Sequence, residues 1–490
     1  MILFAASDCY SRRGMNHVSR LFVIAVLFLS VTVLAQKVSL NTFAFTHVAV
    51  IDVVSGRAMP DMTVIVTGSR ISAVGGSDSL HPPAGAQVVN ATGKFLIPGL
   101  WDMHVHVGFD ANSLSLFLPN GVTGMRIMWG NAVHHMWRKS IEDGSLLAPR
   151  MVIASNLIDG PNSRRQGSTV ARNAEEGRAA VRKAKEDGAD FVKVYSLLPR
   201  DAYFAIADEA KKLGLPFAGH IPIAVSPIEA SNAGQRSVEH LTELIQSTSR
   251  RAEEMGKVRI DASAHRPVDP AEARFVWRTY QDTFNPELAA AFVAHFKRNG
   301  TWQTPTLTQL RGQEFLDTSL RDDPRLKYLD ASTKANWQQT ADQAQQRTSQ
   351  DIDLSKWRWQ RYLELVGMMN HAGVPILAGT DVLNPWCLPG FSLHDELALL
   401  VQAGLTPAAA LQTATINPAR FLGREKDLGT ISKGKIADLV LLDANPLQDI
   451  RNTTRINAVV VNGRLLDRPA LDRMLSQVEA AAASSQKAVK

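Results

Sequence analysis

The sequence predicts an α/β protein, in which a parallel (β/α)8 barrel carries a small β-sandwich domain formed from both ends of the chain. In the middle of the chain, short apolar runs alternate with helical stretches rich in Ala, Glu and Lys, and this alternation is typical of a parallel barrel. Toward both ends, the pattern changes to short runs rich in Val and Ile with Gly at the turns, which predicts strands and hairpins.

Eight candidate strands define the barrel. They are expected at residues 99–106, 122–128, 151–157, 191–195, 216–220, 237–240, 301–306 and 375–381. Among the connecting segments, helices are predicted at 174–187 and 200–213. Each ends near a glycine, Gly188 or Gly214, as the C-terminus of a helix favours.

Two long excursions precede the seventh and eighth strands, at about residues 246–286 and 309–360. The second excursion is polar and helical, rich in Gln, Arg and Asp. Long insertions of this kind often form lids or walls of an active site, and we expect them over the C-terminal mouth of the barrel. A helix that is simply solvated is the alternative.

The two β-rich ends are each too small to enclose a core, so we expect them to pair into one domain. The N-terminal part is assigned to residues 36–97 and the C-terminal part to 426–470, with the barrel at 98–425 and a helix and tail at 471–490. At about 150 residues per domain, a chain of 490 residues predicts two or three domains. The split β unit makes that number two.

The first residues predict an export signal. Residues 21–34 form an apolar run that ends at Ala35 among small residues, and the run is shorter than the roughly 20 residues that cross a bilayer. We therefore expect a cleaved signal peptide over 1–35 and a periplasmic or secreted protein. An uncleaved signal anchor is the alternative, and translation starts at Met1 or Met15.

The composition excludes several classes of protein. Hydrophobic residues make up 45% and charged residues 20% of the chain, which excludes a disordered or fibrous protein. The net charge of +6 comes without a basic run or zinc-finger spacing, so we expect no nucleic-acid partner. Cys9 and Cys387 are the only cysteines, too few for a disulfide scaffold. No segment beyond the signal is long and apolar enough to span a membrane.

Polar residues stand at the carboxyl ends of the candidate strands, where the chemistry of a barrel is placed. His104 and His106 are two apart on an extended strand, so both imidazoles point into the lumen. Other apolar runs end in Lys193, His220, His240 and Asp381. One such residue is typical of a hydrogen-bonded core, but burying six without an ion is costly. Imidazole and oxygen ligands suit divalent metals, so the sequence predicts a metal site.

These residues resemble the pattern of the amidohydrolase superfamily, which comprises metal-dependent hydrolases with a TIM barrel and a split β domain. FLIPGLWDMHVH is similar to the opening HxH strand of that family, GTD to its terminal aspartate, and LGTISKGKIADLVLLD to its return into the β domain. GADFVKVYS looks most like the Xaa-Pro dipeptidase and imidazolonepropionase-like group. The resemblance covers nearly all of the chain after the predicted signal.

The resemblance implies a binuclear site. An ammonium group has no lone pair for a metal, and in similar proteins the corresponding lysine reacts with CO₂ to give a carbamate that bridges two ions. The resemblance therefore implies two divalent ions, most simply Zn²⁺. In this assignment the more buried ion is bound by His104, His106 and Asp381, and the second ion by His220 and His240. Carboxylated Lys193 lies between the two ions. A bridging hydroxide attacks the substrate, and Asp381 carries its proton to the leaving amine; a plain ligand role for Asp381 is the alternative.

The expected substrate is a small molecule with an amide bond, such as a dipeptide or an N-acyl amino acid. Its carboxylate needs a cation, and Arg164 and Arg165 follow the third strand. Tyr195 lies two residues beyond Lys193 and shares its face of the strand. For these three residues, loop solvation and wall packing are the alternatives to substrate binding.

Other polar residues of the barrel predict structural roles. We expect His134, His135 and His394 to serve in loops or helix caps, and Arg126 to pair with a carboxylate inside the barrel.

Several functions remain open on sequence alone. Organophosphate or lactone hydrolysis uses the same binuclear site, and relatives that open cyclic amides with one metal generally lack the bridging lysine. A metal-free scaffold is the non-enzymatic alternative, although no ligand position is replaced here. A homo-oligomer is compatible with the sequence, which leaves the native metal and the number of chains open.

Overall fold

The computed structural model describes residues 41–108, 111–263, 269–315 and 322–488. The predicted signal peptide and Cys9 lie outside these residues, whereas Cys387 is buried and not in a disulfide. In the described part of the chain, no helix has the length and apolar character needed to cross a bilayer.

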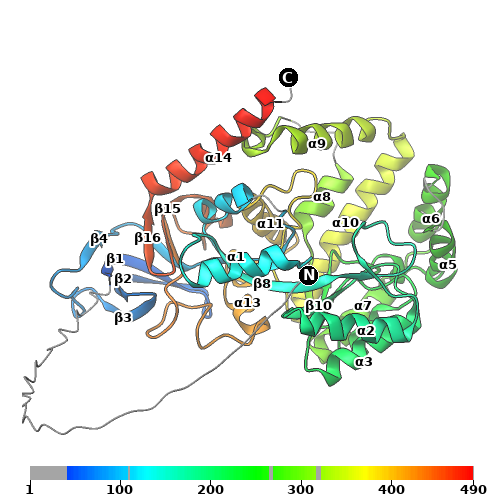
Figure 1. Cartoon of the computed structure of the whole chain (residues 1–490), viewed down its shortest axis with the longest axis horizontal. Coiled ribbons are helices and arrows are strands. Elements are labelled where there is room, and N and C mark those ends of the chain that lie inside the picture. Colours follow the sequence, from blue (N-terminus) through cyan, green and yellow to red (C-terminus); the bar gives the residue numbers. More distant parts are fainter. Residues whose placement is uncertain (1–40, 109–110, 264–268, 316–321, 489–490) are drawn as a thin grey trace, which may run out of the picture. The chain divides into compact units, whose positions relative to one another are not determined.

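The first sheet unites strands from both ends of the described chain (Figure 1). Its order is β16-β15-β14-β5-β1-β2-β3, with β4 beside β1. The strands are β1 (Thr42–Asp52), β2 (Arg57–Thr67), β3 (Arg70–Gly76), β4 (Gln87–Asn90), β5 (Phe95–Pro98), β14 (Leu439–Leu442), β15 (Ile456–Val461) and β16 (Arg464–Asp467). One buried cluster includes Phe43, Val66, Leu439 and Val460, so alternate residues of early and late strands share a core. This arrangement confirms a β domain built from both chain ends.

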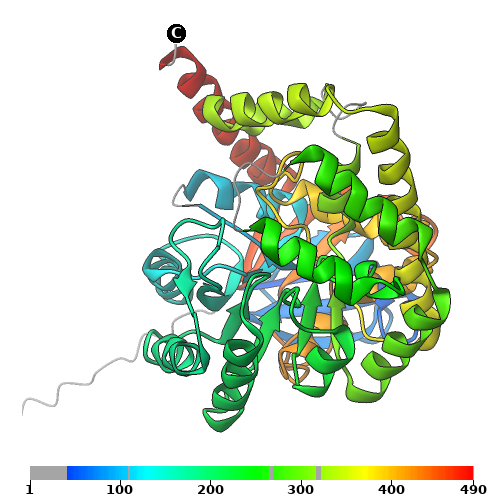
Figure 2. The ribbon, with the colours of Figure 1, turned by 90° about the vertical axis from the view of Figure 1, so that its right-hand side faces the viewer.

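The second sheet is parallel, in the order β13-β12-β11-β10-β8-β7-β6 with β9 beside β8, and helices pack outside it (Figure 2). Its strands are β6 (Leu100–Val105), β7 (Val122–Ile127), β8 (Arg150–Asp159), β9 (Thr169–Val170), β10 (Phe191–Val194), β11 (Phe217–Gly219), β12 (Ser237–Glu239) and β13 (Trp302–Thr304). Seven of them match predicted strands with small shifts at the ends. The sequence therefore predicted the parallel barrel correctly.

The eighth strand is an extended segment instead of a regular strand. Residues 375–382 form single parallel bridges, Gln303 to Ile376 on one side and Val105 to Val382 on the other. The segment thus lies between β13 and β6 and closes the ring. The prediction of a regular strand at 375–381 was wrong in this respect.

The local backbone explains the irregular eighth segment. Asp381 has a φ of 56°, a left-handed conformation that interrupts an extended strand. A Cβ at Gly379 would stand 2.6 Å from Thr304 Cγ2 and 2.8 Å from His104 Cβ. The segment therefore passes so close to its neighbours that only glycine fits at this position.

The remaining elements are helical. They are η1 (Ala111–Leu116), η2 (Leu118–Asn120), α1 (Ala132–Glu142), α2 (Ala174–Glu186), α3 (Arg200–Lys212), α4 (Pro227–Asn232), η3 (Gln246–Thr248), α5 (Ala252–Ser263), α6 (Pro270–Asp282), α7 (Pro286–Asn299), α8 (Leu307–Glu314), η4 (Pro324–Tyr328), α9 (Ala331–Ala344), α10 (Ser349–Ala372), α11 (Phe391–Gln402), α12 (Pro407–Thr413), α13 (Ile416–Phe421), η5 (Ile450–Thr454) and α14 (Arg468–Ala488). The bounds of α2 and α3 agree with the predicted helices. The side chain of Asn173 caps α2, and its buried residues include Ala180, Val181 and Ala184, which lie on one helical face.

The two excursions differ in what they cover. In the first excursion, α6 lines both cavities described below and α5 lines the smaller one, as predicted for walls. In the second excursion, α9 packs against the C-terminal helix α14 (Figure 1): the Ala331 N–H donates to Ser485 Oγ, and Trp337 packs on Trp386. Helix α9 thus packs both on α14 and on the segment that follows Asp381, and a lid or wall role for it stays a prediction.

A buried carboxylate on α11 makes stability depend on pH. Glu396 is fully buried and accepts hydrogen bonds from the backbone N–H and hydroxyl of Thr308. Burial raises the pKa of Glu396 from 4.5 to about 8, against the effect of these hydrogen bonds. Between these two pH values the folded chain keeps a proton that the unfolded chain has released. The contribution of Glu396 to the free energy of unfolding is therefore largest below about pH 4.5, and it is lost as the pH rises toward 8.

The variant Glu396→Gln is expected to remove this loss, because glutamine accepts the same hydrogen bonds without a charge. Its free energy of unfolding should exceed that of the wild type by an amount that grows with pH, by up to about 1.4 kcal/mol per pH unit. Urea unfolding of both proteins at pH 5 and pH 8 measures the difference. Equal pH dependence in the two proteins would contradict the assignment.

Candidate metal centre

The structure brings all six predicted ligand residues together at the carboxyl ends of the barrel strands. His104 lies in β6 and Lys193 in β10, and His106, His220 and His240 follow β6, β11 and β12 directly. Ring centroids are 4.3 Å apart for His104 and His240, 4.9 Å for His220 and His240, and 5.3 Å for His104 and His106. Asp381 comes from the closing segment and lies beside three of these rings.

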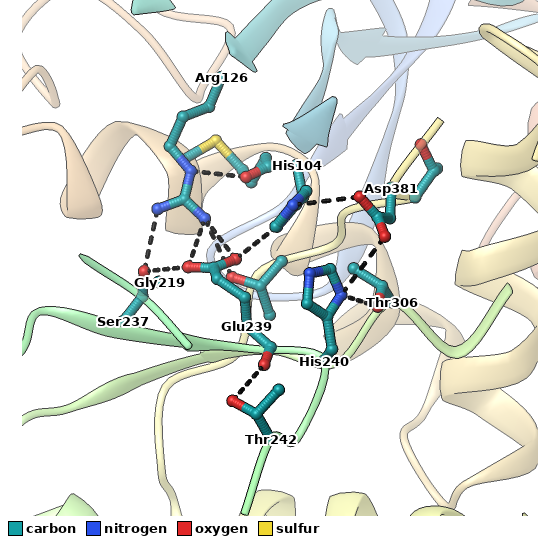
Figure 3. A network of polar contacts seen from close by, with 12 residues as sticks. His104, Arg126, Gly219, Ser237, Glu239, His240, Thr242, Thr306 and Asp381 are labelled. Carbon is teal, nitrogen blue, oxygen red and sulfur yellow. Dashed lines mark hydrogen bonds and ion pairs between the residues drawn. The ribbon is translucent and has the colours of Figure 1, made fainter. Parts of the chain in front are cut away.

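The protonation of His104 follows from its neighbours (Figure 3). Its Nδ1 lies 2.8 Å from Glu239 Oε2, and because an ionised carboxylate only accepts, Nδ1 carries the proton. The lone pair of Nε2 then faces Asp381 Oδ1 at 3.3 Å. Both atoms are buried and have no hydrogen-bond partner. Two acceptors that face each other at this distance fit a cation between them.

His106 completes a group of three ligands. Its Nε2 is 3.0 Å from Asp381 Oδ1, and one ligand atom from each of His104, His106 and Asp381 lies within 4.8 Å of the others. Two imidazole nitrogens and a carboxylate oxygen are a donor set suited to Zn²⁺. These residues fit the more buried ion that the resemblance implies.

Hydroxyl groups orient the other two imidazoles. His220 Nδ1 is 2.7 Å from Ser196 Oγ, and His240 Nδ1 is 2.7 Å from Thr306 Oγ1 (Figure 3). In each ring, this contact leaves Nε2 available. A partner on the far nitrogen is the usual support for a metal-binding histidine, so both residues fit a second ion.

Lys193 is fully buried inside the barrel, and its Nζ has no hydrogen-bond partner. Burial lowers the pKa of its ammonium to about 8, although the charges of Glu239 and Asp381 oppose this shift. A buried amine without a partner is costly. A carbamate on Nζ, with two oxygens for metal ions, fits this environment.

The pKa values of the other candidate ligands favour the protonation states in which these side chains bind cations. Burial lowers the pKa of the imidazoles of His106, His220 and His240, so these rings are neutral at pH 7. For Asp381, burial opposes ionisation, but the contacts with His240 and His104 outweigh it and hold the pKa of the carboxyl well below its usual range. Neutral imidazoles and an ionised carboxylate are the protonation states of metal ligands.

Strained backbone positions two of these residues. His240 has a φ of 59° and Asp381 a φ of 56°, values that non-glycine residues adopt uncommonly. Asp381 is also fixed by Asn384, whose Nδ2 donates to Oδ2 at 2.6 Å, and by its own N–H, which donates to the His104 carbonyl. Such strain is typical of functional sites.

A cavity of about 1210 Å³ opens over these residues and includes His106, His220, His240 and Asp381 in its lining. Tyr195 stacks on His220, with ring centroids 3.9 Å apart. The structure therefore places Tyr195 at the site.

The two predicted substrate-binding arginines separate in the structure. Arg165 lines the large cavity and donates from Nε to Tyr195 Oη at 3.0 Å. Arg164 lines a neighbouring cavity instead. Of the two, only Arg165 is brought to the candidate metal centre.

A family model described as the amidohydrolase family matches residues 95–466, which is most of the chain. The chain belongs to the amidohydrolase family. The predicted resemblance is thereby confirmed at the level of the family.

Relatives and solved structures extend the comparison. The amidohydrolase is 43% identical over 93 residues to an imidazolonepropionase from Shouchella clausii (strain KSM-K16), a match that covers 19% of this chain and 20% of the relative. It thus spans about a fifth of that relative. The solved bottromycin amidohydrolase shares 25% identity with a TM-score of 0.74, over 90% of this chain and 91% of that one. A Xaa-Pro dipeptidase with bound methionine in the active site shares the fold, with a TM-score of 0.62 and 19% identity over 87% of this chain and 100% of that one.

Sequence reasoning missed the residues that hold the ligands of this amidohydrolase in place. Glu239 was not recognised, although it directly precedes His240 and ends a strand that carries a ligand. Arg126 was predicted to pair with a carboxylate, and its Nη2 lies 2.8 Å from Glu239 Oε2, which confirms that prediction. Ser196 and Thr306 gave no signal, because a hydroxyl in a loop has many ordinary roles.

Three further histidines of the amidohydrolase, His134, His135 and His394, were predicted to have structural roles. His134 forms a capping box with Asn131 at the start of α1, and His394 contacts Thr453 Oγ1 and the Asn120 carbonyl. These contacts confirm the structural roles predicted for both. His135 contacts Arg138, and both His134 and His135 also line the large cavity.

Proposed function

We propose that this amidohydrolase is a binuclear metal-dependent enzyme that hydrolyses an amide bond in a small substrate bearing a carboxylate, such as a dipeptide or an N-acyl amino acid. The observation that carries the proposal is the convergence of four imidazoles, Asp381 and Lys193 below a cavity, with buried ligand atoms that lack hydrogen-bond partners. Burial of so many polar groups is favourable when cations bind between them.

The proposed ligands follow from the geometry described above. His104, His106 and Asp381 would hold one ion, His220 and His240 would hold the other, and a carboxylated Lys193 would serve both, with Zn²⁺ as the most suitable metal. When bound, two such ions polarise a carbonyl and lower the pKa of water.

The side chains of the enzyme then have separate tasks. Asp381 accepts a proton at its carboxylate and delivers it to the leaving amine, a role for which Asn384 and the backbone hold it in place. Arg165 binds the substrate carboxylate, and Tyr195 orients the guanidinium through its hydroxyl. Arg164 is a weaker candidate, because it lines the neighbouring cavity.

Metal removal tests the proposal directly. The purified protein is expected to hold two divalent ions per chain, to lose hydrolysis of N-acyl amino acids on chelation and to regain it with Zn²⁺. Lys193→Met is expected to hold at most one ion, because its side chain cannot form the bridge. Elemental analysis and hydrolysis assays on the same samples measure both. An active protein with no bound metal would refute the proposal.

A second candidate function comes from the relatives. Imidazolonepropionase and an adenine deaminase 2 from Rhizobium meliloti are among the similar proteins, the latter 46% identical over 102 residues. Cyclic amides therefore belong in the substrate panel, as do lactones and organophosphates, which use the same type of centre. Lys193 favours the binuclear type over a one-metal enzyme. Hydrolysis of cyclic amides alone would replace the N-acyl amino acid proposal.

We also propose that the enzyme is exported and that the signal is removed after Ala35. The mature protein is then expected to begin at Gln36. Sequencing the N-terminus of the protein recovered from the periplasm or medium measures the cleavage site.

A further inference from the structure

A second cavity adjoins the one over the candidate metal centre. It has a volume of about 510 Å³, which is within the usual range for small-molecule sites. Arg165, Tyr195 and Trp277 line both cavities, so these three side chains form the boundary between them. The far wall comes from α5 and α6, the helices of the first excursion.

Part of the lining of the second cavity is apolar. It includes Ile223, Val258, Ala262 and Val276. Of the three arginines in the lining, Arg259 is neutralised by Glu243 through two contacts of 2.7 Å. This pairing leaves Arg259 little capacity to bind a second anion, so this part of the lining favours an apolar group.

Trp277 gives the boundary a fixed, apolar face. Arg358 stacks over its ring, with Cζ 4.7 Å from the ring centroid, and Nε of the same arginine donates to Glu314 at 2.7 Å. The indole thus packs against a part-buried ion pair. A rigid aromatic wall is suited to contact with an aliphatic or aromatic side chain.

Arg165 presents a guanidinium at this boundary. Its Nε bonds to Tyr195 Oη, while Asp381 and Asp159 stabilise its charge without a hydrogen bond. The other charged lining residues of the second cavity are Asp159, Arg164 and Glu272. An anion at Arg165 therefore lies between the metal centre and the apolar wall.

Contacts between neighbouring side chains lead from the candidate metal centre to Arg165. The Tyr195 ring is 3.9 Å from the His220 ring, and Arg165 bonds to the hydroxyl of that tyrosine. In an N-acyl amino acid, the scissile carbonyl and the carboxylate are separated by one residue, about 3.5 Å of extended chain. A substrate with its carbonyl at the histidines can therefore extend along Tyr195 toward Arg165, with its α-carbon substituent directed to the second cavity.

We propose that the second cavity is a subsite for the side chain on the amine half of the substrate, and that it selects N-acyl amino acids or dipeptides whose C-terminal residue is large and apolar, such as leucine or phenylalanine. This inference rests on the proposed function, because it uses the metal centre to place the scissile carbonyl. Arg165 fixes the carboxylate of the same residue.

Matched substrates and variants test the subsite. The zinc-loaded wild type is expected to hydrolyse N-acetyl-L-phenylalanine with a kcat/KM roughly 10- to 100-fold above that for N-acetylglycine, the usual gain from burying such a side chain. Ala273→Phe narrows the cavity from α6 and should bring this ratio close to one, because it lowers the rate with N-acetyl-L-phenylalanine much more than the rate with N-acetylglycine. Ala271→Phe, on the same helix and exposed, should keep the wild-type ratio.

Calorimetry with the same two compounds separates this inference from the proposed function. If the wild type hydrolyses neither compound, the amide-hydrolase proposal fails, but tighter binding of N-acetyl-L-phenylalanine that Ala273→Phe abolishes still supports the subsite. Hydrolysis of both compounds at equal rates would overturn the subsite alone. An equal effect of Ala273→Phe on both compounds, or an equal effect of Ala271→Phe, would also overturn it.

Discussion

Replacing Asp381 with asparagine is expected to lower kcat/KM for an N-acyl amino acid by about 10²- to 10⁴-fold, the usual contribution of a positioned proton carrier. Asparagine has nearly the same size and keeps one oxygen, but it cannot accept the proton that the leaving amine needs. In addition, Asn384 donates to Asp381 Oδ2, so an asparagine at 381 turns its oxygen toward that donor and its amide nitrogen toward His104 and His106. We therefore expect weaker metal binding as well as slower hydrolysis.

Metal content separates the two contributions of Asp381. If excess Zn²⁺ restores both ions but not the rate of hydrolysis, the lost rate is due to the missing proton transfer. If the rate recovers fully, Asp381 acts only as a metal ligand. Asp187→Asn is a matched control, because Asp187 lines the same cavity but is exposed and lies outside the ligand set. Its kcat/KM should stay near that of the wild type.

Replacing Arg126 with methionine is expected to lower the free energy of unfolding by about 3–5 kcal/mol, the range for a buried ion pair that loses one partner. Arg126 and Glu239 are both fully buried, and the guanidinium also donates to Ser237 Oγ at 2.9 Å and to the Met103 carbonyl. Without Arg126, Glu239 keeps its charge in the barrel with only His104 and Ser237 as hydrogen-bond partners among the described side chains. Urea unfolding of the metal-free protein measures the loss without a contribution from bound ions.

The double variant Arg126→Met/Glu239→Gln provides the control for this prediction. Glutamine removes the unpaired charge but still accepts a hydrogen bond from His104 Nδ1, so part of the stability should return. A double variant no more stable than Arg126→Met, or a single variant within about 1 kcal/mol of the wild type, would contradict the role assigned to the pair.

Much of this fold and site was predictable because the signals are local. Each barrel strand is a short apolar run, and the residues proposed as ligands stand where such runs end, as Lys193 and His220 do. The helices α2 and α3 carried their periodicity and glycine stops in the sequence itself.

The unpredicted features depend on contacts between distant segments. The partner of Arg126 is Glu239, 113 residues away, and no local pattern indicates which lumen residues face each other. The irregular eighth segment results from the tight approach of Gly379 to β6 and β13, and the apolar side chains of α9 pack on Trp386 and Leu388, which follow Asp381 in the chain. The second cavity likewise exists only where α5 and α6 meet the barrel.

The pairing of strand β5 affects when the candidate metal centre can form during synthesis of the chain. β5 pairs with β14, with Ile97 opposite Val440, and the Gly99 N–H donates to the Asp438 carbonyl at 2.7 Å. The very next strand is β6, which carries His104 and ends directly before His106. During synthesis, the first two of the candidate ligands therefore emerge early, but β5, the strand directly before theirs, pairs with β14 only after the C-terminal strands have been made. Such non-local pairing is slow to form, so we expect a ribosome-bound chain that stops before β14 to lack a competent metal centre even though it already contains every residue proposed to bind the ions.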